Sequence, residues 1–152
     1  MDPSAKILNF LDDHHIKYEV LEHEPVFTSE QAAKIRGTEL CQGAKTLLLK
    51  TGGEFVLAVL PGERRLDTKK LKKILGVKDL RFALPEEVEK IMGCQIGACY
   101  PFGNLIGVRM VVDQAMGDNE IITFNIGRHD RSVKMRWDDY KNITKAEVVE
   151  IT

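Results

Sequence analysis

The sequence predicts one α/β domain over residues 1–152, built around a mixed or largely antiparallel sheet. Helix-like and strand-like segments mix without the regular βα repeat of a doubly wound fold. Two β-rich runs, 44–50 and 54–60, flank Gly52-Gly53 and indicate a hairpin. The 152 residues are enough to bury a core, and 43% hydrophobic and 30% charged residues are typical of a folded globular protein.

Three elements are expected before the hairpin. Apolar residues recur at helical spacing over residues 4–14, and residues 17–21 alternate as a short strand. A T-x-x-Q capping box at Thr28 then opens a helix that ends at Gly37.

After the hairpin, Asp67 is expected to cap a helix that turns its leucines inward and its lysines outward and ends at Gly76. Residues 78–83 read as a strand. Pro85 starts another helix, which Gly93 ends.

The last third of the chain is predicted to hold three strands, at 107–112, 120–125 and 132–137. Asp138 or Asp139 is expected to cap a final helix.

Charge and hydropathy exclude several classes of protein. The net charge is −1, from 22 basic and 23 acidic residues, so any attraction to nucleic acid requires a local patch. No apolar run approaches the roughly 20 residues that cross a bilayer, and the N-terminus lacks the apolar stretch of a secretory signal. We therefore expect a cytoplasmic protein that does not bind membranes.

The metal-binding residue types show no metal-binding pattern. The three cysteines form no CxxC pair and are odd in number, which indicates reduced thiols rather than a disulfide framework. The four histidines have no zinc-ligand spacing and no HExxH motif. We expect neither a metal nor another cofactor.

The segment from Gly97 to Gly103 holds two glycines and a proline within seven residues. A loop bent in this way can turn backbone N–H groups toward a bound carbonyl or phosphate. The alternative is a tight connection between a helix and a strand that simply needs glycine. The apparently exposed Phe102 makes the segment more than a minimal turn.

Lys45 lies near the start of an otherwise apolar strand. Its neighbours Gly43 and Ala44 are small and leave room for an anion beside it. The alternative is a solvated lysine at a strand end, which is the commoner situation for lysine.

Two further groups are open to more than one interpretation. His129 next to Asp130 suggests an oriented base, but the surrounding segment equally fits a turn between two strands. The concentrated basic region is either a solvated helix face or a site for a phosphate backbone; it comprises Arg64, Arg65, Lys69, Lys70, Lys72, Lys73 and Lys78.

Rival chemistries lack their motifs. There is no G-x-S-x-G elbow, and Cys99 has no histidine in its local context to act as a base. Neither a Walker nor a Rossmann glycine pattern is present.

Three short motifs, taken together and in order, resemble the YbaK/ProX family. They are Lys45-Thr46-Leu47, Gly97-x-x-x-Pro101-Phe102-Gly103 and Phe124-Asn125-x-Gly127-x-His129-Asp130. Members of this family are free-standing relatives of the editing domain that is inserted in bacterial prolyl-tRNA synthetases. The likeness runs over nearly the whole chain.

The resemblance implies a compact α/β domain with a mixed, partly barrel-like sheet. It also implies hydrolysis of the ester between a wrong amino acid and tRNA, with Lys45 at the terminal adenosine or its phosphate and the Gly97–Pro101 loop on the aminoacyl carbonyl. Because 152 residues leave no room for a synthetase domain, the protein is expected to act in trans. Its partners would be aminoacylated tRNA and, as a further candidate, a synthetase.

On this basis the predicted catalytic groups are Lys45 and the backbone of Gly97 and Ala98. The predicted substrate-binding residues are Cys99, Tyr100, Pro101, Phe102, Gly103 and His129. The residues predicted to contact the tRNA more weakly are Arg64, Arg65, Lys69 and Lys72.

The leading hypothesis is a deacylase for small amino acids, with alanine or cysteine on proline tRNA as the candidates. A second hypothesis is a non-catalytic module with the same fold that binds tRNA or a synthetase. A third is a small-molecule esterase, which would show little dependence on salt because it makes no phosphate contacts.

Overall fold

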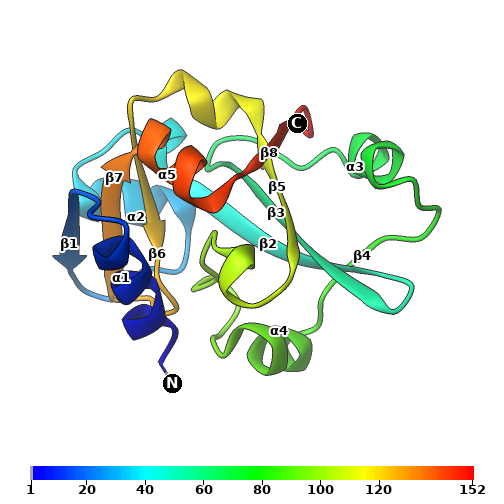
Figure 1. Cartoon of the computed structure of the whole chain (residues 1–152), viewed down its shortest axis with the longest axis horizontal. Helices are drawn as coiled ribbons and strands as arrows, with labels where there is room; N and C mark the ends of the chain where they lie inside the picture. Colours follow the sequence, from blue (N-terminus) through cyan, green and yellow to red (C-terminus); the bar gives the residue numbers. More distant parts are fainter. Residues whose placement is uncertain (1) are drawn as a thin grey trace.

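The computed structural model describes residues 2–152, and in this part of the chain eight strands form two sheets (Figure 1). The smaller sheet has the strand order β1 (Tyr18–Glu22), β7 (Arg131–Arg136) and β6 (Ile121–Asn125). The larger sheet has the order β4 (Arg81–Phe82), β2 (Ala44–Thr51), β3 (Glu54–Pro61), β5 (Arg109–Asp113) and β8 (Glu147–Val149).

Strand directions confirm an α/β fold with a mixed, mostly antiparallel arrangement. Both pairs of the smaller sheet and the pairs β2–β3 and β2–β4 are antiparallel, whereas β3–β5 and β5–β8 are parallel. The strands divide into two sheets rather than forming one continuous sheet. A single parallel bridge between Gly43 and Thr123 links them, just where β2 begins.

Five α-helices surround the sheets within the described residues. They are α1 (Pro3–Asp13), α2 (Ser29–Arg36), α3 (Thr68–Leu75), α4 (Pro85–Met92) and α5 (Trp137–Thr144). The expected N-caps are confirmed: the side chain of Thr28 accepts from the Gln31 N–H, and that of Asp67 accepts from two N–H groups of α3. The glycines expected to end α2, α3 and α4 all adopt the left-handed conformation.

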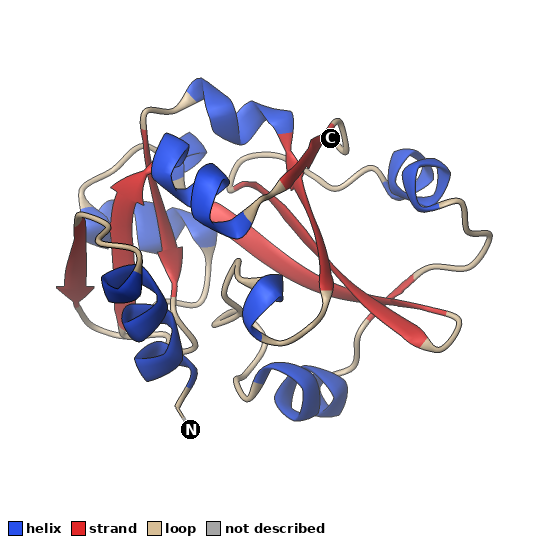
Figure 2. Ribbon diagram, in the orientation of Figure 1, coloured by secondary structure: helices blue, strands red, loops and turns tan. Residues whose placement is uncertain are grey.

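Two hydrophobic cores lie on opposite faces of the larger sheet. The main core fills the space between the two sheets and receives Ile7 from α1, Met92 from α4 and Tyr140 from α5. The second core lies under α3, where Leu71 and Ile151 pack on the other face. Helices α3 and α4 therefore cover opposite faces of this sheet, as Figure 2 shows.

The structure corrects several predicted boundaries. The strand expected over 78–83 shortens to β4, because only Leu49 and Lys50 of β2 pair with it. The strand expected to reach Trp137 ends at Arg136, since Trp137 already starts α5. Asp138 and Asp139 consequently lie in the first turn of α5 and do not cap it.

Several short elements were not predicted from the sequence. They are the 3-10 turns η1 (Leu40–Gln42), η2 (Gly103–Leu105) and η3 (Gln114–Asp118), and strand β8. The helices of residues 2–152 are all too short or too polar to cross a membrane.

Candidate functional site

A cavity of about 380 Å³ opens between α2, the start of β2, β4 and the loop at Gly97. Its walls are Val26, Phe27, Thr28, Ser29, Ala32, Arg36, Gly43, Ala44, Lys45, Thr46, Leu47, Leu48, Phe82, Ala83, Val88, Ile96, Gly97, Cys99 and Asn125. Among the described residues that line it, two are cations and none is an aspartate or glutamate. The cavity is therefore suited to an anionic or electron-rich ligand.

Lys45 lies at the edge of this cavity, and its ammonium is held by main chain. The Nζ atom donates a 2.7 Å hydrogen bond to the carbonyl oxygen of Arg64. Burial lowers the pKa of Lys45, while the carboxylates of Glu30 and Glu63 oppose that change. One of the three ammonium N–H groups is thus used, and two stay available to a ligand.

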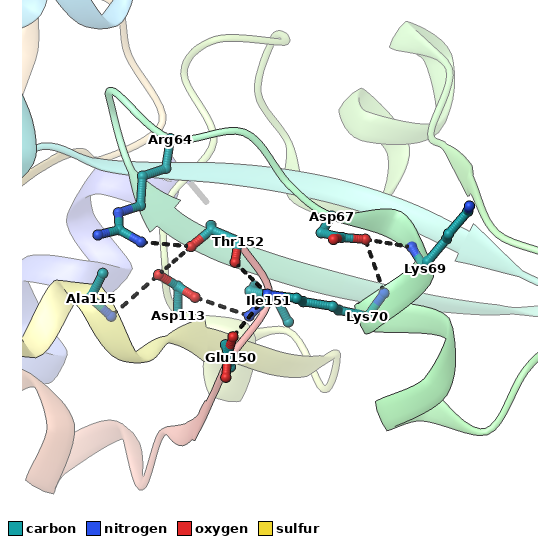
Figure 3. Close-up of polar contacts among 9 residues, drawn as sticks. All are labelled: Arg64, Asp67, Lys69, Lys70, Asp113, Ala115, Glu150, Ile151 and Thr152. Atoms are coloured by element: carbon teal, nitrogen blue, oxygen red, sulfur yellow. Dashed lines mark hydrogen bonds and ion pairs between the residues drawn. The ribbon is translucent and has the colours of Figure 1, made fainter.

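The loop that carries the Arg64 carbonyl is tied to the end of the chain (Figure 3). Arg64 Nη1 donates to Thr152 Oγ1 at 3.1 Å, and the Asp67 N–H donates to the Ile151 carbonyl at 2.7 Å. The fully buried Asp113 accepts from the Ile151 N–H at 3.0 Å and from Thr152 Oγ1 at 3.1 Å. Asp113 therefore anchors the segment against which Lys45 rests.

The Gly97 loop supplies the other side of the site. Gly97 has a φ of +90°, which an L side chain rarely adopts, so this bend requires glycine. Its carbonyl accepts a 2.7 Å hydrogen bond from Asn125 Nδ2, which holds the loop against β6. The loop is thereby fixed before any ligand arrives.

Of the two predicted backbone donors, Gly97 and Ala98, the structure retains Gly97 and replaces Ala98 by Cys99. The Ala98 N–H already donates to the Gln95 carbonyl at 3.0 Å, so Ala98 offers no free donor. No hydrogen bond from the Gly97 or Cys99 N–H to an oxygen is found among residues 2–152, so these two groups are the candidate donors of the loop. A hydrogen bond from the Cys94 thiol lowers the pKa of Cys99, while burial opposes that change.

The remaining predicted loop residues belong to the core and do not line the cavity. The Tyr100 hydroxyl donates to the Met92 carbonyl, and the Pro101 carbonyl accepts from Tyr140, both at 2.7 Å. Phe102 is fully buried against other aromatic rings, and a Cβ on Gly103 would come within 2.4 Å of the Val108 carbonyl. The side chains of Tyr100 and Phe102 thus pack in the main core beneath the loop.

His129 lies behind the loop and is not paired with Asp130. Its Nε2 lies 3.1 Å from the Ile96 carbonyl, which can only accept, so Nε2 carries the proton in this contact. The ring packs against Phe27 with centroids 4.6 Å apart. Asp130 pairs with Arg128 at 2.8 Å instead, so it does not orient His129 as a base.

The predicted basic region is split by the fold. Arg64 is tied to Thr152, while Arg65 is exposed close enough to Lys45 to lower its pKa. Lys69 is exposed on α3. Lys72 lines a separate shallow depression that also contains Lys50, Lys78 and Arg81. Only Arg64 and Arg65 lie near the cavity.

Arg36 and Asn125 are site residues that sequence reasoning missed. The Arg36 guanidinium donates to Ser132 Oγ, to Thr123 Oγ1 and to Asn125 Oδ1, at 2.9, 3.1 and 3.0 Å. Burial lowers the pKa of Arg36 to about 10, so it stays charged at neutral pH. In the sequence it looked like an ordinary base in a last helical turn. The Phe124-Asn125 motif was the only available signal for Asn125.

Metal chemistry has no visible donor set in residues 2–152, where no three His, Cys, Asp or Glu side chains gather in a way that could hold an ion. All three cysteines are free thiols. The site thus consists of two cations, main-chain groups and a few neutral polar side chains.

Comparison with known proteins places this geometry in a family. The model of the aminoacyl-tRNA editing domain matches residues 23–143. The chain is 33% identical over 149 residues to the multifunctional Ser/Thr-tRNA deacylase ProXp-y of Escherichia coli (strain K12), covering 95% of this chain and 89% of the relative. It is 28% identical over 152 residues to the prolyl-tRNA editing protein ProX of Acetoanaerobium sticklandii, covering 96% and 93%. A crystal structure described as a candidate trans-editing enzyme for prolyl-tRNA synthetase superposes with a TM-score of 0.86 at 23% identity, over 100% of this chain and 98% of that one.

Proposed function

The chain belongs to the aminoacyl-tRNA editing domain family, and we propose that it is a deacylase that acts in trans on mischarged tRNA. The reaction would hydrolyse the ester between the 3′ end of a tRNA and a small amino acid. The observation that carries this proposal is the pairing, in one cavity, of two cations without an acidic residue and a bent glycine loop in which the Gly97 and Cys99 N–H groups have no oxygen partner among residues 2–152.

The loop is suited to stabilising the charge that develops on the ester. Attack by water turns the carbonyl oxygen into an oxyanion. The N–H groups of Gly97 and Cys99 would donate to it, and the proton lost by the attacking group would pass to the departing ribose oxygen. Loss of one such donor raises a barrier by about 3 kcal/mol.

The cations and the rim are suited to the tRNA end. Lys45 and Arg36 would attract the terminal phosphate, which supports binding of nucleic acid by a chain of net charge −1. Phe27, Phe82 and Ile96 are 66%, 54% and 53% exposed around the mouth, an unusual concentration of apolar surface. The two phenylalanine rings can stack on a nucleobase.

The buried part of the cavity wall would favour a small amino acid. It includes the side chains of Ala44, Leu48, Ala83 and Val88. Alanine and cysteine on proline tRNA are the candidates that the family resemblance suggests, and the E. coli relative is named for serine and threonine. A synthetase would be the further partner, since editing in trans follows mischarging.

The test is a panel of tRNAs charged with alanine, cysteine, serine, threonine or proline, with ester loss measured under single turnover. Wild-type protein should deacylate at least one small mischarged ester and spare the prolyl ester. Lys45→Ala should fold normally but lose deacylation, whereas Lys6→Ala, at an exposed position of α1, should retain it.

Two results would overturn the proposal in different ways. An unchanged rate for Lys45→Ala would remove this lysine from the mechanism. Binding of tRNA without loss of any ester would favour the non-catalytic module, and cleavage of free aminoacyl esters without dependence on tRNA or salt would favour the small-molecule esterase.

A further inference from the structure

Thr46 carries a buried hydroxyl that no other group satisfies. It lies on β2 with 9% of its surface exposed, and Oγ1 has no hydrogen-bond partner among residues 2–152. A buried polar group without a partner is uncommon, because burial costs it the hydrogen bonds it would make with water. The other unpaired side-chain atoms of the described chain are in Ser4, Thr38 and Arg131, and none of these lines the cavity.

The direction of the Thr46 side chain follows from the strand. Side chains two residues apart on a strand leave the same face, so Thr46 shares its face with Ala44 and Leu48. Both of these belong to the main core, whereas Leu49 belongs to the second core on the opposite face. Lys45, one residue away, therefore leaves the strand toward the Arg64 loop. Thr46 therefore leaves the same face of the sheet as Ala44 and Leu48, two buried residues that line the cavity.

The exposed fractions of the lining residues distinguish the mouth of the cavity from its buried wall. Buried residues that line the cavity together with Thr46 are Ala44, Leu48, Ala83, Val88 and Cys99, and each is less than a tenth exposed. Phe27, Phe82 and Ile96 at the mouth are more than half exposed. A ligand whose nucleotide stays at the mouth would therefore place its smallest and most distal part against Thr46. In an aminoacyl ester that part is the amino-acid side chain.

We propose that Thr46 selects aminoacyl groups that bear a side-chain hydroxyl, with the seryl ester preferred; the inference rests on the proposed deacylase function. A hydroxyl both donates and accepts, so it pairs with the Thr46 hydroxyl in either direction. Alanine brings no polar group, and the thiol of cysteine is a weak donor and acceptor. The buried residues that line the cavity with Thr46 are apolar apart from the Cys99 thiol. Among the described lining residues, Thr46 is therefore the one buried residue that carries a hydroxyl.

Substitution of Thr46 by valine removes the hydroxyl while keeping the shape, and substitution by serine keeps the hydroxyl. For one tRNA charged in turn with serine, threonine, alanine or cysteine, Thr46→Val should lower kcat/KM for the seryl ester on the order of tenfold, the usual effect of losing one neutral hydrogen bond. The alanyl rate should change less than about twofold, because that ester makes no such bond. Thr46→Ser should keep the preference for seryl over alanyl ester. Thermal unfolding should show Thr46→Val to be as stable as the wild type or more so.

A loss of rate by Thr46→Val that is equal for all four esters, or a seryl rate that does not change, would overturn the inference. Failure of the underlying function is recognised separately, by the affinity of adenosine carrying a non-hydrolysable 3′-seryl or 3′-alanyl amide. One outcome is that no ester is cleaved, while the wild type binds the seryl amide more tightly than the alanyl amide and Thr46→Val binds the two equally. That outcome would support selection by Thr46 and refute the deacylase function. Equal affinity of the wild type for the two amides would refute selection.

Discussion

The ammonium of Lys45 rests on the carbonyl oxygen of Arg64 at 2.7 Å, and Arg64 in turn donates through its side chain to Thr152 at 3.1 Å. Lys45 and Thr152, which are more than a hundred positions apart in the sequence, are thus linked through Arg64 at the edge of the cavity. The buried Asp113 holds Thr152 in place, so the setting of the proposed catalytic lysine depends on the last residues of the chain.

Replacing Thr152 with valine should loosen the loop under Lys45. The variant removes the hydroxyl that accepts from Arg64 and donates to Asp113, and each such bond contributes about 0.5–1.5 kcal/mol. We expect a melting temperature lower by several degrees and slower deacylation. Thr152→Ser keeps the hydroxyl and is the matched control. Equal behaviour of the two variants would show that this hydroxyl does not position the loop.

Asn125→Asp should separate stability from activity. The carboxylate still accepts from Arg36 Nη2 and gains a charge pair with it, but it cannot donate to the Gly97 carbonyl. The thermal stability should therefore be unchanged or higher. Single-turnover deacylation should fall on the order of tenfold, since 1.36 kcal/mol in a barrier is tenfold in rate. An active Asn125→Asp variant would mean that the Asn125 donor does not hold the loop in its working position.

Gly97→Ala should damage the loop with a modest effect on folding. The φ of +90° is strained for alanine, and the added Cβ would lie 3.3 Å from His129 Nε2. Strain of this kind costs about 1–3 kcal/mol, and relief by moving the loop would misplace its N–H groups. Gly53→Ala in the hairpin turn, where a Cβ meets nothing within 4 Å, serves as the control. Deacylation at the wild-type rate by Gly97→Ala would show that the bend is not needed.

Glu87 should make stability depend on pH in acid. Hydrogen bonds from Arg81, the main cause, and from the Leu84 N–H lower the pKa of Glu87 from 4.5 to about 2. A carboxylate with a depressed pKa in the folded state stabilises fully above pH 4.5, and this contribution is lost as the pH falls through 4.5 toward 2. Urea unfolding at pH 6 and pH 3 should show that Glu87→Gln is destabilised at pH 6 and loses less stability than the wild type on acidification.

The control for that measurement is Glu86→Gln in the same helical turn, because Glu86 takes part in none of the ion pairs found in residues 2–152. Its acid sensitivity should match the wild type. If Glu87→Gln shows the same acid sensitivity as well, the link between β4 and α4 through Arg81 does not contribute to stability.

The elements that could be predicted from sequence are those decided by neighbouring residues. Thr28 and Asp67 cap helices because their side chains reach N–H groups two or three positions ahead. Gly76 ends α3 because its left-handed conformation is open to glycine. The hairpin 44–60 follows from alternation around two glycines in the same way.

The surroundings of the residues in the Gly97–Gly103 loop could not be predicted from their neighbours in the sequence. Tyr100 and Phe102 were expected at the substrate, but their rings complete the core between the two sheets, and a ring of that size gains more by burial than by exposure at a rim. Ala98 was expected to donate a hydrogen bond, and only the folded loop shows that its N–H already binds Gln95. Whether a backbone N–H is free depends on groups that fold back against it.

The sequence by itself determined the α/β class, most helix ends, the hairpin and the motifs that identify the family, because these depend on propensity, periodicity and residues close along the chain. Tertiary structure decided what surrounds the cavity: the Arg64 carbonyl under Lys45, the Arg36–Asn125–Gly97 chain of hydrogen bonds and the unpaired hydroxyl of Thr46. These contacts depend on how the two sheets pack. Packing brings together groups that are far apart in the sequence, and no local pattern predicts that they will touch.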